Sequence, residues 1–339
     1  MENVFVSICI PSFNRPKELV RLLSSIDLKC TGNLEIVICE DNAPLRDKVR
    51  QAVNEFSLAR PDLSIKYYEN HNNLGYDKNL RELINKATGE YIIFMGDDDE
   101  FIPGCLEHYI DFLKSNSNLA YVLRSYRIIH DDRKIEYFKY YPETKFFSSG
   151  IDTYIELFRK SVFISGFTFK RKAAIPFHTD WFDGTLLYQL YLLSELCINF
   201  SSSYYGIPIT QMRDEGIPYF GTSENEKDLY TPGSITIINS INFMKGFTKI
   251  SRYIDGKYGT DSTSDILIDI SKYSYPILAI QRNKGAKSFK YYCSELKKLG
   301  INRTIHYKLY VIGLTIFGTS FCNLLIRFIK SVLGKTPKL

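Results

Sequence analysis

Short apolar segments alternate with amphipathic ones along the first hundred residues of the chain. The apolar segments are rich in β-branched residues and predict four strands, at residues 4–10, 35–39, 64–68 and 90–95. Between the strands, apolar residues recur at helical spacing, as in Leu19, Leu22, Leu23 and Ile26. Strands and helices that alternate in this way predict an α/β fold, with a mostly parallel sheet and helices on both faces.

The pattern changes after about residue 115. A strand is predicted at 120–130, and strand-like residues recur at 204–210 within an otherwise loop-rich segment, 201–222. Helical periods are found at residues 151–159, 186–196, 234–253, 266–280 and 284–299. We therefore expect four segments: residues 1–115, 116–225, a helical C-terminal region at 226–305, and a tail at 306–339.

Acidic residues follow two of the predicted strands. Asp41 ends the second strand, and Asp97, Asp98 and Asp99 follow the fourth. Open α/β sheets bind ligands at the carboxyl ends of their strands, so we expect both groups to face one crevice. Three successive aspartates repel one another unless a cation or hydrogen-bond donors compensate them, and such hard oxygens suit Mg²⁺ or Mn²⁺ that also contacts a diphosphate. The alternatives are an acidic turn or a helix N-cap for the triplet and a helix cap for Asp41.

Composition narrows the class of protein. The chain has 339 residues, 45% of them apolar and 24% charged, which excludes a disordered, collagen-like or disulfide-framework protein. Its seven cysteines include no CxxC pair and are expected to be free thiols in a reducing compartment. The five histidines lack zinc-site spacing. We recognise no secretory signal at the N-terminus and expect a cytoplasmic protein.

Four motifs then occur in a fixed order. They are VSICIPSFNR at 6–15, EIVICEDN at 35–42, NLG at 73–75 with Asn79, and ATGEYIIFMGDDD at 87–99. Their order and spacing resemble those of family 2 glycosyltransferases. The resemblance implies the GT-A fold, a Rossmann-like nucleotide-binding sheet continuous with an acceptor-binding half. Residues 1–115 would then bind a nucleotide-sugar donor and residues 116–225 the acceptor. Within the family, the length, the aromatic residues at 180–189 and the basic tail resemble bacterial abequosyltransferase-like and other deoxyhexosyl transferases.

The resemblance also implies which residues bind the donor. They come from the first three motifs: Pro11, Phe13 and Arg15 beneath the nucleotide, Asp41 on the base or ribose, and Asn73, Gly75 and Asn79 around the pocket. One departure is Glu40, where the family often has Asp. This change keeps the charge and lengthens the side chain.

The aspartate triplet matches the family's DXD motif, with Asp97 and Asp99 at its ends. The resemblance implies that Asp99 ligates Mn²⁺ or Mg²⁺ directly. Asp97 is expected to bind the donor ribose or metal-held water, and Asp98 to lie in the donor site between them. Gly96 is a second departure, since the family usually has a larger residue there.

Members of the family are expected to invert the anomeric carbon in one displacement, with a carboxylate as the base. Asp180 and Asp183 are candidates for this base, beside the single tryptophan, Trp181, whose ring suits a sugar acceptor. We prefer Asp183 because it directly precedes a helix-like segment. The family's usual Glu-Asp pair is missing, so Glu195 or another acid stays open as the base.

Arg213 follows the strand-like residues 204–210 and leads into a loop containing glycine and proline. Basic residues at such a place close over the diphosphate in related enzymes, and we expect the same of Arg213. A plain surface ion pair is the alternative.

Charge is divided unevenly along the chain. Residues 282–339 carry 12 Lys and Arg and one acid, so the remainder has a charge of −6 within a total of +5. The apolar segment 309–326 lies between these basic residues but contains Gly, Ser, Thr and Asn. We expect an interfacial helix on an anionic membrane. A membrane span and a packed helix or oligomer contact are alternatives. No nucleic-acid motif accompanies the tail, so we expect no nucleic-acid partner.

Together these features predict an inverting, metal-dependent glycosyltransferase that acts on a polyprenyl-diphosphate-linked glycan of bacterial O-antigen or capsule synthesis, peripheral to the cytoplasmic face of the inner membrane. A nucleotidyltransferase is one rival, but residues 6–15 lack its glycine-rich loop. A non-catalytic glycan- or membrane-binding module is the other, and the intact Asp41, Asp97 and Asp99 argue against it.

Overall fold

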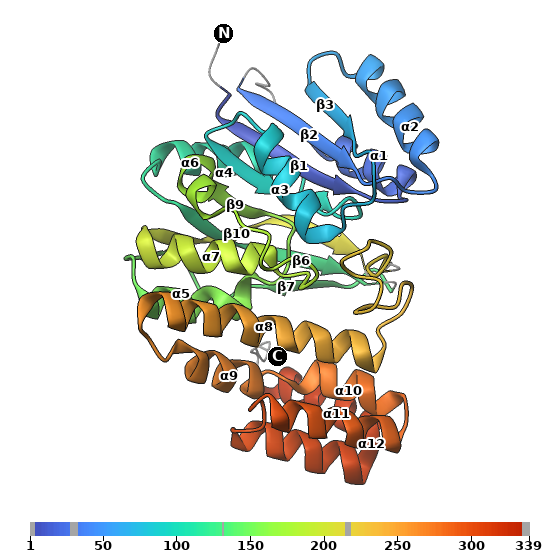
Figure 1. Cartoon of the computed structure of the whole chain (residues 1–339), viewed down its shortest axis with the longest axis vertical. Coiled ribbons are helices and arrows are strands. Elements are labelled where there is room, and N and C mark those ends of the chain that lie inside the picture. Colours follow the sequence, from blue (N-terminus) through green and yellow to red (C-terminus); the bar gives the residue numbers. More distant parts are fainter. Residues whose placement is uncertain (1–3, 28–32, 131, 214–217, 334–339) are drawn as a thin grey trace. The chain divides into compact units, whose positions relative to one another are not determined.

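The computed structural model describes residues 4–27, 33–130, 132–213 and 218–333. The chain forms two compact units, one comprising Met1–Asp228 with Pro232–Ser234 and the other Leu229–Thr231 with Ile235–Leu339. Figure 1 shows that the first unit is built on a sheet covered by helices, whereas the second is helical.

One sheet runs through the whole of the first unit, in the order β3-β2-β1-β4-β9-β6-β10-β5, with β7 beside β6 and β8 beside β10. Its strands are β1 (Val6–Ser12), β2 (Leu34–Glu40), β3 (Ser64–Glu69), β4 (Tyr91–Phe94), β5 (Glu100–Phe101), β6 (Tyr121–Ile129), β7 (Ile135–Phe138), β8 (Lys145–Phe147), β9 (Phe167–Lys170) and β10 (Ser202–Arg213). Strand β1 pairs in parallel with both β2 and β4. The predicted α/β class is confirmed. The sheet is mixed rather than mostly parallel: β2 with β3 and β6 with β10 are also parallel, whereas the pairings of β5, β7, β8 and β9 are antiparallel.

Helices cover both faces of this sheet (Figure 1). They are α1 (Pro16–Ser24), α2 (Arg46–Ala59), α3 (Tyr76–Lys86), α4 (Cys105–Ser115), α5 (Ile151–Phe158), α6 (Arg171–Ala174) and α7 (Tyr188–Asn199), with short 3₁₀ turns at Arg159–Ser161 and Ile175–Phe177. Ile8 and Ile10 of β1 pack in one hydrophobic core with apolar residues of α1, α2 and α4. Cys9, which lies between them, faces α3. This alternation explains why β1 reads as a nearly continuous apolar run, since both of its faces are buried.

Three features of the first unit differ from the predicted pattern. Neither α4 nor β9 was predicted, and β9 is antiparallel between β4 and β6. Strand β10 runs through half of the segment that was predicted to be loop-rich. It accommodates Pro208 because its register with β6 shifts on both sides of that residue, as at a β-bulge.

The second unit consists of helices α8 (Ile237–Tyr258), α9 (Ser262–Lys272), α10 (Tyr275–Asn283), α11 (Ala286–Lys298) and α12 (Ile305–Leu333). The single helix predicted at 266–280 is wrong, because the chain breaks into α9 and α10 with a proline in the first turn of α10. Helix α12 holds most of the predicted tail, is kinked at Gly318 and packs on α10 and α9. Lys335 and Lys338 of the tail lie outside the described residues.

The described cysteines are all free thiols, and Cys9, Cys39, Cys197 and Cys322 are buried. This agrees with the expected reduced state, while Cys30 lies outside the described residues.

Candidate active site

The loops that follow β1 and β4 meet at the point where the strand order reverses. The chain leaves β1 for β2 and β3 on one side and returns to β4 on the other. Phe13 N donates to Oδ2 of Asp97 at 2.9 Å, and Arg15 donates to Oδ1 of the same carboxylate at 2.8 Å. Such a switch point is where open α/β sheets bind their ligands. The structure therefore brings together three residues that the motifs proposed, Phe13, Arg15 and Asp97.

Asp97 and Asp98 share the guanidinium of Arg15. Asp98 lies 3.1 Å from Nη2 of Arg15, and Asp97 is only 3% exposed. Burial raises the pKa of Asp97 to about 6, while the charge of Arg15 opposes that rise. The backbone carbonyl of Asp98 accepts a further bond from Arg21 of α1 at 2.7 Å. Basic groups thus hold the start of the triplet in place from the β1 side.

Asp99 is held from the other side of the triplet. Ser165, which precedes β9, donates its hydroxyl to Oδ2 of Asp99 and accepts a bond from Gly96 N at 2.9 Å. Burial, followed by repulsion from Asp98 and Asp97, raises the pKa of Asp99 well above its usual value. Ser165 was not foreseen from the sequence, because nothing in the local pattern links it to a residue 66 positions earlier.

The triplet has the chemistry of a site for a divalent cation. Among the described residues no three His, Cys, Asp or Glu side chains already surround a common metal position. However, among the described residues the ion pairs of these three carboxylates are with Arg15, which leaves excess negative charge at a place where Asp97 and Asp99 are buried. A hard divalent cation would relieve this repulsion, so the donor set fits Mg²⁺ or Mn²⁺.

Asp41 organises the loop between β3 and α3. Its carboxylate accepts bonds from Leu74 N at 2.8 Å, from Gly75 N at 2.9 Å and from Asn70 Nδ2 at 2.8 Å. Burial raises its pKa to about 6, and these donors oppose the rise. Asn79 adds to the same network, since Asn70 also donates to its amide oxygen at 2.9 Å. The motif residues of 70–79 thus converge on Asp41.

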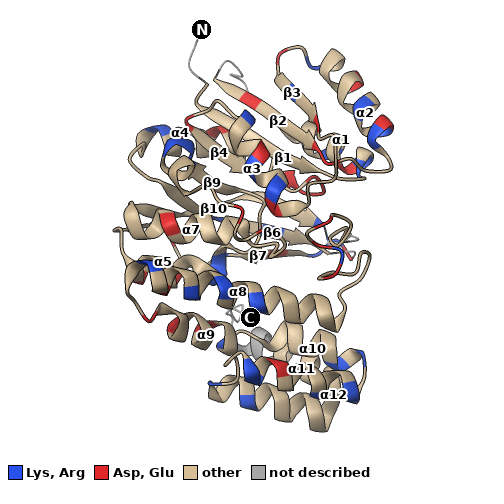
Figure 2. Cartoon of the chain, in the orientation of Figure 1, with Lys and Arg blue, Asp and Glu red and all other residues tan. Residues whose placement is uncertain are grey.

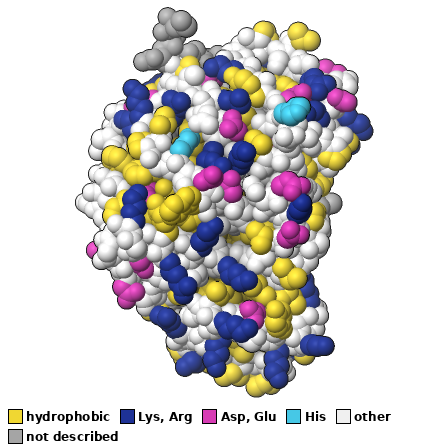
Figure 3. Space-filling model, viewed as in Figure 1, with side chains coloured by type: hydrophobic (Ala, Val, Ile, Leu, Met, Phe, Trp, Pro, Cys, Tyr) yellow, Lys and Arg dark blue, Asp and Glu magenta, His cyan; other side chains and the backbone are white. Residues whose placement is uncertain are grey.

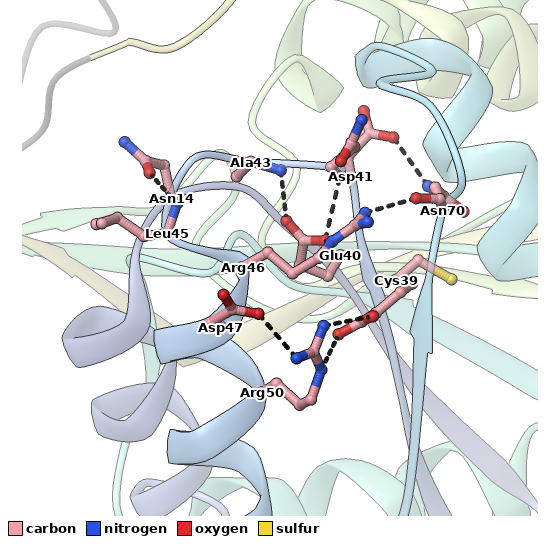
Figure 4. A network of polar contacts seen from close by, with 12 residues as sticks. Asn14, Cys39, Glu40, Asp41, Ala43, Leu45, Arg46, Asp47, Arg50 and Asn70 are labelled. Atoms are coloured by element: carbon pink, nitrogen blue, oxygen red, sulfur yellow. Dashed lines mark hydrogen bonds and ion pairs between the residues drawn. The ribbon is translucent and has the colours of Figure 1, made fainter.

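The neighbouring Glu40 has a different role, which Figure 4 shows. Its carboxylate accepts bonds from Ala43 N at 2.7 Å and Asn42 N at 3.1 Å and pairs with Arg46 of α2. It therefore shapes the turn that leads from β2 into α2, while Asp41 points toward Asn70. Glu40, which is longer than the Asp that the family often has here, thus uses its side chain to stabilise this turn.

A loop that the sequence did not single out contacts the start of α3 near Gly75. Glu226, only 3% exposed, accepts bonds from Tyr76 N at 2.7 Å and Gly221 N at 2.9 Å, and Asn73 donates to Thr222 at 3.0 Å. Gly75 has φ +79°, and a Cβ there would lie 2.4 Å from the hydroxyl of Ser223. Glycine is therefore required by both conformation and space.

Aromatic side chains line the β1 loop in the same region. The ring of Tyr219 lies 5.9 Å from that of Phe13, and the guanidinium of Arg15 lies 5.1 Å from the Tyr219 ring. Pro11 remains within β1, opposite Cys39. The predicted loop that contains Tyr219 begins at Asp214, and residues 214–217 lie outside the described residues.

The two candidate bases have different surroundings. Asp183 forms a two-pronged ion pair with Arg81 of α3, in which Nη2 donates to Oδ2 at 2.8 Å. Asp180 is exposed, and its carbonyl accepts Asp183 N at 3.0 Å. Trp181 is 66% exposed, in keeping with a surface for a sugar. Glu195 is fully buried within α7.

Arg213 lies at the end of β10, where its Nε donates to Glu100 at 2.7 Å. Arg21 reaches the same carboxylate at 3.0 Å, and Gln211 donates to it at 3.1 Å. Arg213 is thus anchored on the residue that follows Asp99, and its action on a diphosphate remains a prediction.

Comparison with known proteins decides the family. Residues 7–175 match the profile described as glycosyl transferase family 2, a segment that contains all four motifs. The chain belongs to glycosyl transferase family 2. The match ends before Asp180 and Asp183, so the choice of Asp183 as the base, made from the sequence, stays a prediction.

Named relatives lie within the same family. A GalNAc(5)-diNAcBac-PP-undecaprenol β-1,3-glucosyltransferase of Campylobacter jejuni is 32% identical over 118 residues, 34% of this chain and 36% of that protein. The UDP-Glc:α-D-GlcNAc-diphosphoundecaprenol β-1,3-glucosyltransferase WfgD of Escherichia coli is 30% identical over 132 residues, 39% of this chain and 49% of that protein. The abequosyltransferase RfbV of Salmonella typhimurium is 29% identical over 116 residues, 34% of either chain. The matches thus cover between a third and a half of these relatives.

Solved structures support the fold of this family 2 protein over nearly its full length. TarS 1–349 of S. aureus has a TM-score of 0.56 at 13% identity and covers 89% of this chain and 90% of that chain. The same protein in complex with UDP-GlcNAc has a TM-score of 0.57 at 14% identity, with the same coverage. The expected GT-A fold with a helical C-terminal region is confirmed.

Proposed function

We propose that this family 2 protein is an inverting, metal-dependent glycosyltransferase that moves a sugar from a nucleotide-sugar donor to a lipid-linked glycan. The observation that carries the proposal is the junction at the switch point, where Phe13 and Arg15 bind Asp97 beside Asp99. This junction combines donors for an anionic ligand with carboxylates for a divalent cation. A nucleoside diphosphate that carries a metal requires both.

The donor site extends from this junction to the network around Asp41. Loop residues Asn73 and Gly75 and helix residue Asn79 are arranged by that carboxylate and its partners. A nucleoside would lie along this loop, with its diphosphate toward the triplet. A uridine nucleotide is the first candidate, because the name of WfgD includes UDP-Glc and TarS has been solved with UDP-GlcNAc.

The acceptor is proposed from the names of the relatives. Two of them act on sugars carried by undecaprenyl diphosphate, and RfbV is an abequosyltransferase. We therefore propose a polyprenyl-diphosphate-linked intermediate of bacterial O-antigen or capsule synthesis. Trp181, exposed next to Phe182 and the candidate base, offers an aromatic face to one of its sugars.

Asp99 and Asp97 are the residues proposed to hold Mn²⁺ or Mg²⁺. Phe13 and Arg15 each engage one oxygen of Asp97, whereas Ser165 engages Oδ2 of Asp99. This arrangement favours Asp99 as the direct ligand and Asp97 as the residue that acts through water or the ribose. When bound, the cation would offset negative charge on the departing nucleoside diphosphate.

In the proposed reaction, Asp183 accepts the proton of the acceptor hydroxyl as the hydroxyl oxygen attacks the anomeric carbon. The new bond forms on the face opposite the diphosphate, the bond to the diphosphate oxygen breaks, and the configuration inverts. Arg15 stabilises the negative charge that develops on the diphosphate. Arg213, whose Nε donates to Glu100, is proposed to contribute to the same charge compensation.

The second unit carries a surface suited to a membrane. Within the described residues, Ile305–Ile326 is long and apolar enough to cross a bilayer, and 11% of it is buried. Two of its polar side chains are bonded to α10: Tyr275 donates to Asn323 at 2.6 Å, and Thr319 donates to Asn283. Arg282 of α10 donates to the carbonyl of Leu314 at 2.9 Å. Asn323 and Thr319 thus face a neighbouring helix, whereas Thr315 and Ser320 are exposed.

The opposite side of α12 is apolar and exposed. Large side chains that are 48–66% exposed follow one another at helical spacing: Leu309, Ile312, Ile316, Phe317, Phe321, Leu324 and Phe328. Figure 2 marks Lys and Arg residues on the helices of the second unit, and Figure 3 shows Lys and Arg side chains interspersed with hydrophobic ones on one face of the molecule. We propose that α12 lies in the interface of an anionic membrane, here the cytoplasmic face of the inner membrane, because one apolar side bounded by basic residues fits that position.

A donor and acceptor screen tests the proposed reaction. Release of UDP, GDP, CDP or dTDP from the corresponding sugar nucleotides would be measured with Mn²⁺, with and without undecaprenyl-diphosphate-linked GlcNAc or longer glycans. We expect one nucleotide to be released in an acceptor-dependent and EDTA-sensitive reaction, with an inverted linkage in the product. Absence of turnover across the panel, or turnover that persists in EDTA, would contradict the proposal.

A further inference from the structure

Helix α3 contacts the loop that contains Asp183 at two places. The first is the ion pair in which the guanidinium of Arg81 meets both carboxylate oxygens of Asp183. The two side chains are 12% and 15% exposed, so water screens the pair only weakly. The planar fork of arginine matches a carboxylate in one orientation, and it therefore restricts the plane of the Asp183 carboxylate.

Arg81 is itself held by an aromatic ring. Its guanidinium lies 5.4 Å from the centre of the Tyr188 ring, on the first residue of α7. Burial lowers the pKa of Arg81, whereas the hydrogen bond and charge of Asp183 raise it, and the net direction is upward. Arg81 therefore stays charged, and its guanidinium lies between Asp183 and the first residue of α7.

The second place is Asp77, one turn earlier on α3. This carboxylate is 1% exposed and accepts bonds from Leu186 N and Tyr188 N, both at 2.9 Å. Leu186 has φ +61°, a conformation that a branched side chain rarely adopts. The backbone just after Asp183 is thus held in an unusual turn by a residue of α3.

The same helix begins in the donor site. Gly75, at its N-terminal end, donates to Asp41, and Tyr76 donates to Glu226. Arg81 lies six positions after Gly75, a helical rise of about 9 Å. One rigid element therefore connects the loop assigned to the donor nucleotide with the loop assigned to the base.

We propose that Arg81 is a positioning residue for Asp183, which sets the orientation of the carboxylate that takes the acceptor's proton. The proposal rests on the proposed function, in which Asp183 is the base. Arg81 contacts Asp183, which contacts the acceptor hydroxyl. Loss of Arg81 therefore misplaces the base without removing a contact to the donor.

The test compares Arg81→Gln, Arg81→Lys, Asp183→Asn and the Arg81→Gln/Asp183→Asn double variant. Turnover is followed by nucleotide release with the sugar nucleotide and undecaprenyl-diphosphate glycan that give turnover in the wild type, and UDP affinity is measured by calorimetry with Mn²⁺. Arg50→Gln is the matched control, since Arg50 of α2 makes a comparable two-pronged pair with Glu69 at 2.7 and 2.9 Å.

We expect Arg81→Gln to lower kcat about 10- to 100-fold, the loss typical of a misplaced catalytic group, with UDP affinity unchanged. In the Asp183→Asn background the same change should have no further effect, because the group it orients is gone. Arg81→Lys keeps the charge but not the fork, so its kcat should also fall. Arg50→Gln should leave kcat unchanged.

Two kinds of result would overturn the proposal. Wild-type kcat in Arg81→Gln or Arg81→Lys would show that the fork does not orient the base. An equal loss from Arg81→Gln with and without Asp183 would show that Arg81 acts elsewhere. If turnover of Asp183→Asn is too low to measure, Arg81→Lys provides the test. A lower kcat with unchanged UDP affinity would support the proposal, and a wild-type kcat would overturn it. By contrast, wild-type kcat in Asp183→Asn would remove the base assignment itself and, with it, this inference.

Discussion

Arg15 donates to Asp97 across 82 positions of sequence, at 2.8 Å, and so joins the loop after β1 to the loop after β4. The pair is shielded from water, with side-chain exposures of 19% and 4%. Its cation, Arg15, contacts both Asp97 and Asp98. The donor site and the proposed metal site are therefore one electrostatic unit.

Arg15→Met tests this unit. The change leaves Asp97 buried beside Asp98 without its cation and removes a donor from the diphosphate site. A charged hydrogen bond contributes about 1.5–3 kcal/mol, so UDP affinity with Mn²⁺ should fall at least about tenfold. This affinity is measured by calorimetry. Arg60→Met, which breaks the exposed pair with Asp62, is the control and should bind UDP normally. Unchanged affinity in Arg15→Met would contradict the assignment.

Asp99→Ala tests the metal site. Transfer should be abolished, while the circular dichroism spectrum stays that of the wild type, because Asp99 lies in a loop outside the hydrophobic core. The increase in Tm that Mn²⁺ causes in the wild type should also be lost. Asp62→Ala, on the surface, serves as the control for both measurements. Full activity of Asp99→Ala would remove the metal assignment.

Asp77 predicts a dependence of stability on pH. Burial raises its pKa from 3.8 to about 7 in the folded protein. Between these values the folded state binds more protons than the unfolded state, so the free energy of unfolding falls as the pH rises from about 4 to about 7. The free energies of unfolding of the wild type and of Asp77→Asn are measured in urea. The difference between them should change by a few kcal/mol over this pH range, because the wild type loses stability as the pH rises. Parallel curves would refute the assignment of this slope to Asp77.

The exposed side of α12 predicts binding to vesicles. Replacing Phe317 and Phe321 together by Ser removes two side chains that are 59% and 48% exposed. Each buried Phe contributes about 1.5–3 kcal/mol, so flotation with phosphatidylglycerol vesicles should weaken at least tenfold. Binding of the wild type should also be weaker to phosphatidylcholine and in high salt. Leu58→Ser, at an exposed position of α2, is the control. Equal flotation of the double variant and the wild type would exclude α12 as the membrane contact.

Local pattern was enough to place the elements that carry the motifs. β1, β2, β3 and β4 were predicted to within about two residues at their ends, since their side chains are buried on both sheet faces or bounded by turn residues. It was not enough for β9, which is short and antiparallel in the middle of the sheet. It also failed at residues 273–274, where a break separates two segments of the same apolar period.

The sequence by itself determined the class of fold, the family and the positions of Asp41 and the aspartate triplet, because these depend on residue type and spacing within about a hundred residues. Only the tertiary structure decided which side chains meet. The contacts of Ser165 with Asp99, Glu226 with Tyr76 and Arg81 with Asp183 join residues 66, 150 and 102 positions apart. Such contacts arise from the order of the strands and from the seating of α3 against α7, and neither is contained in the periodicity of any one segment.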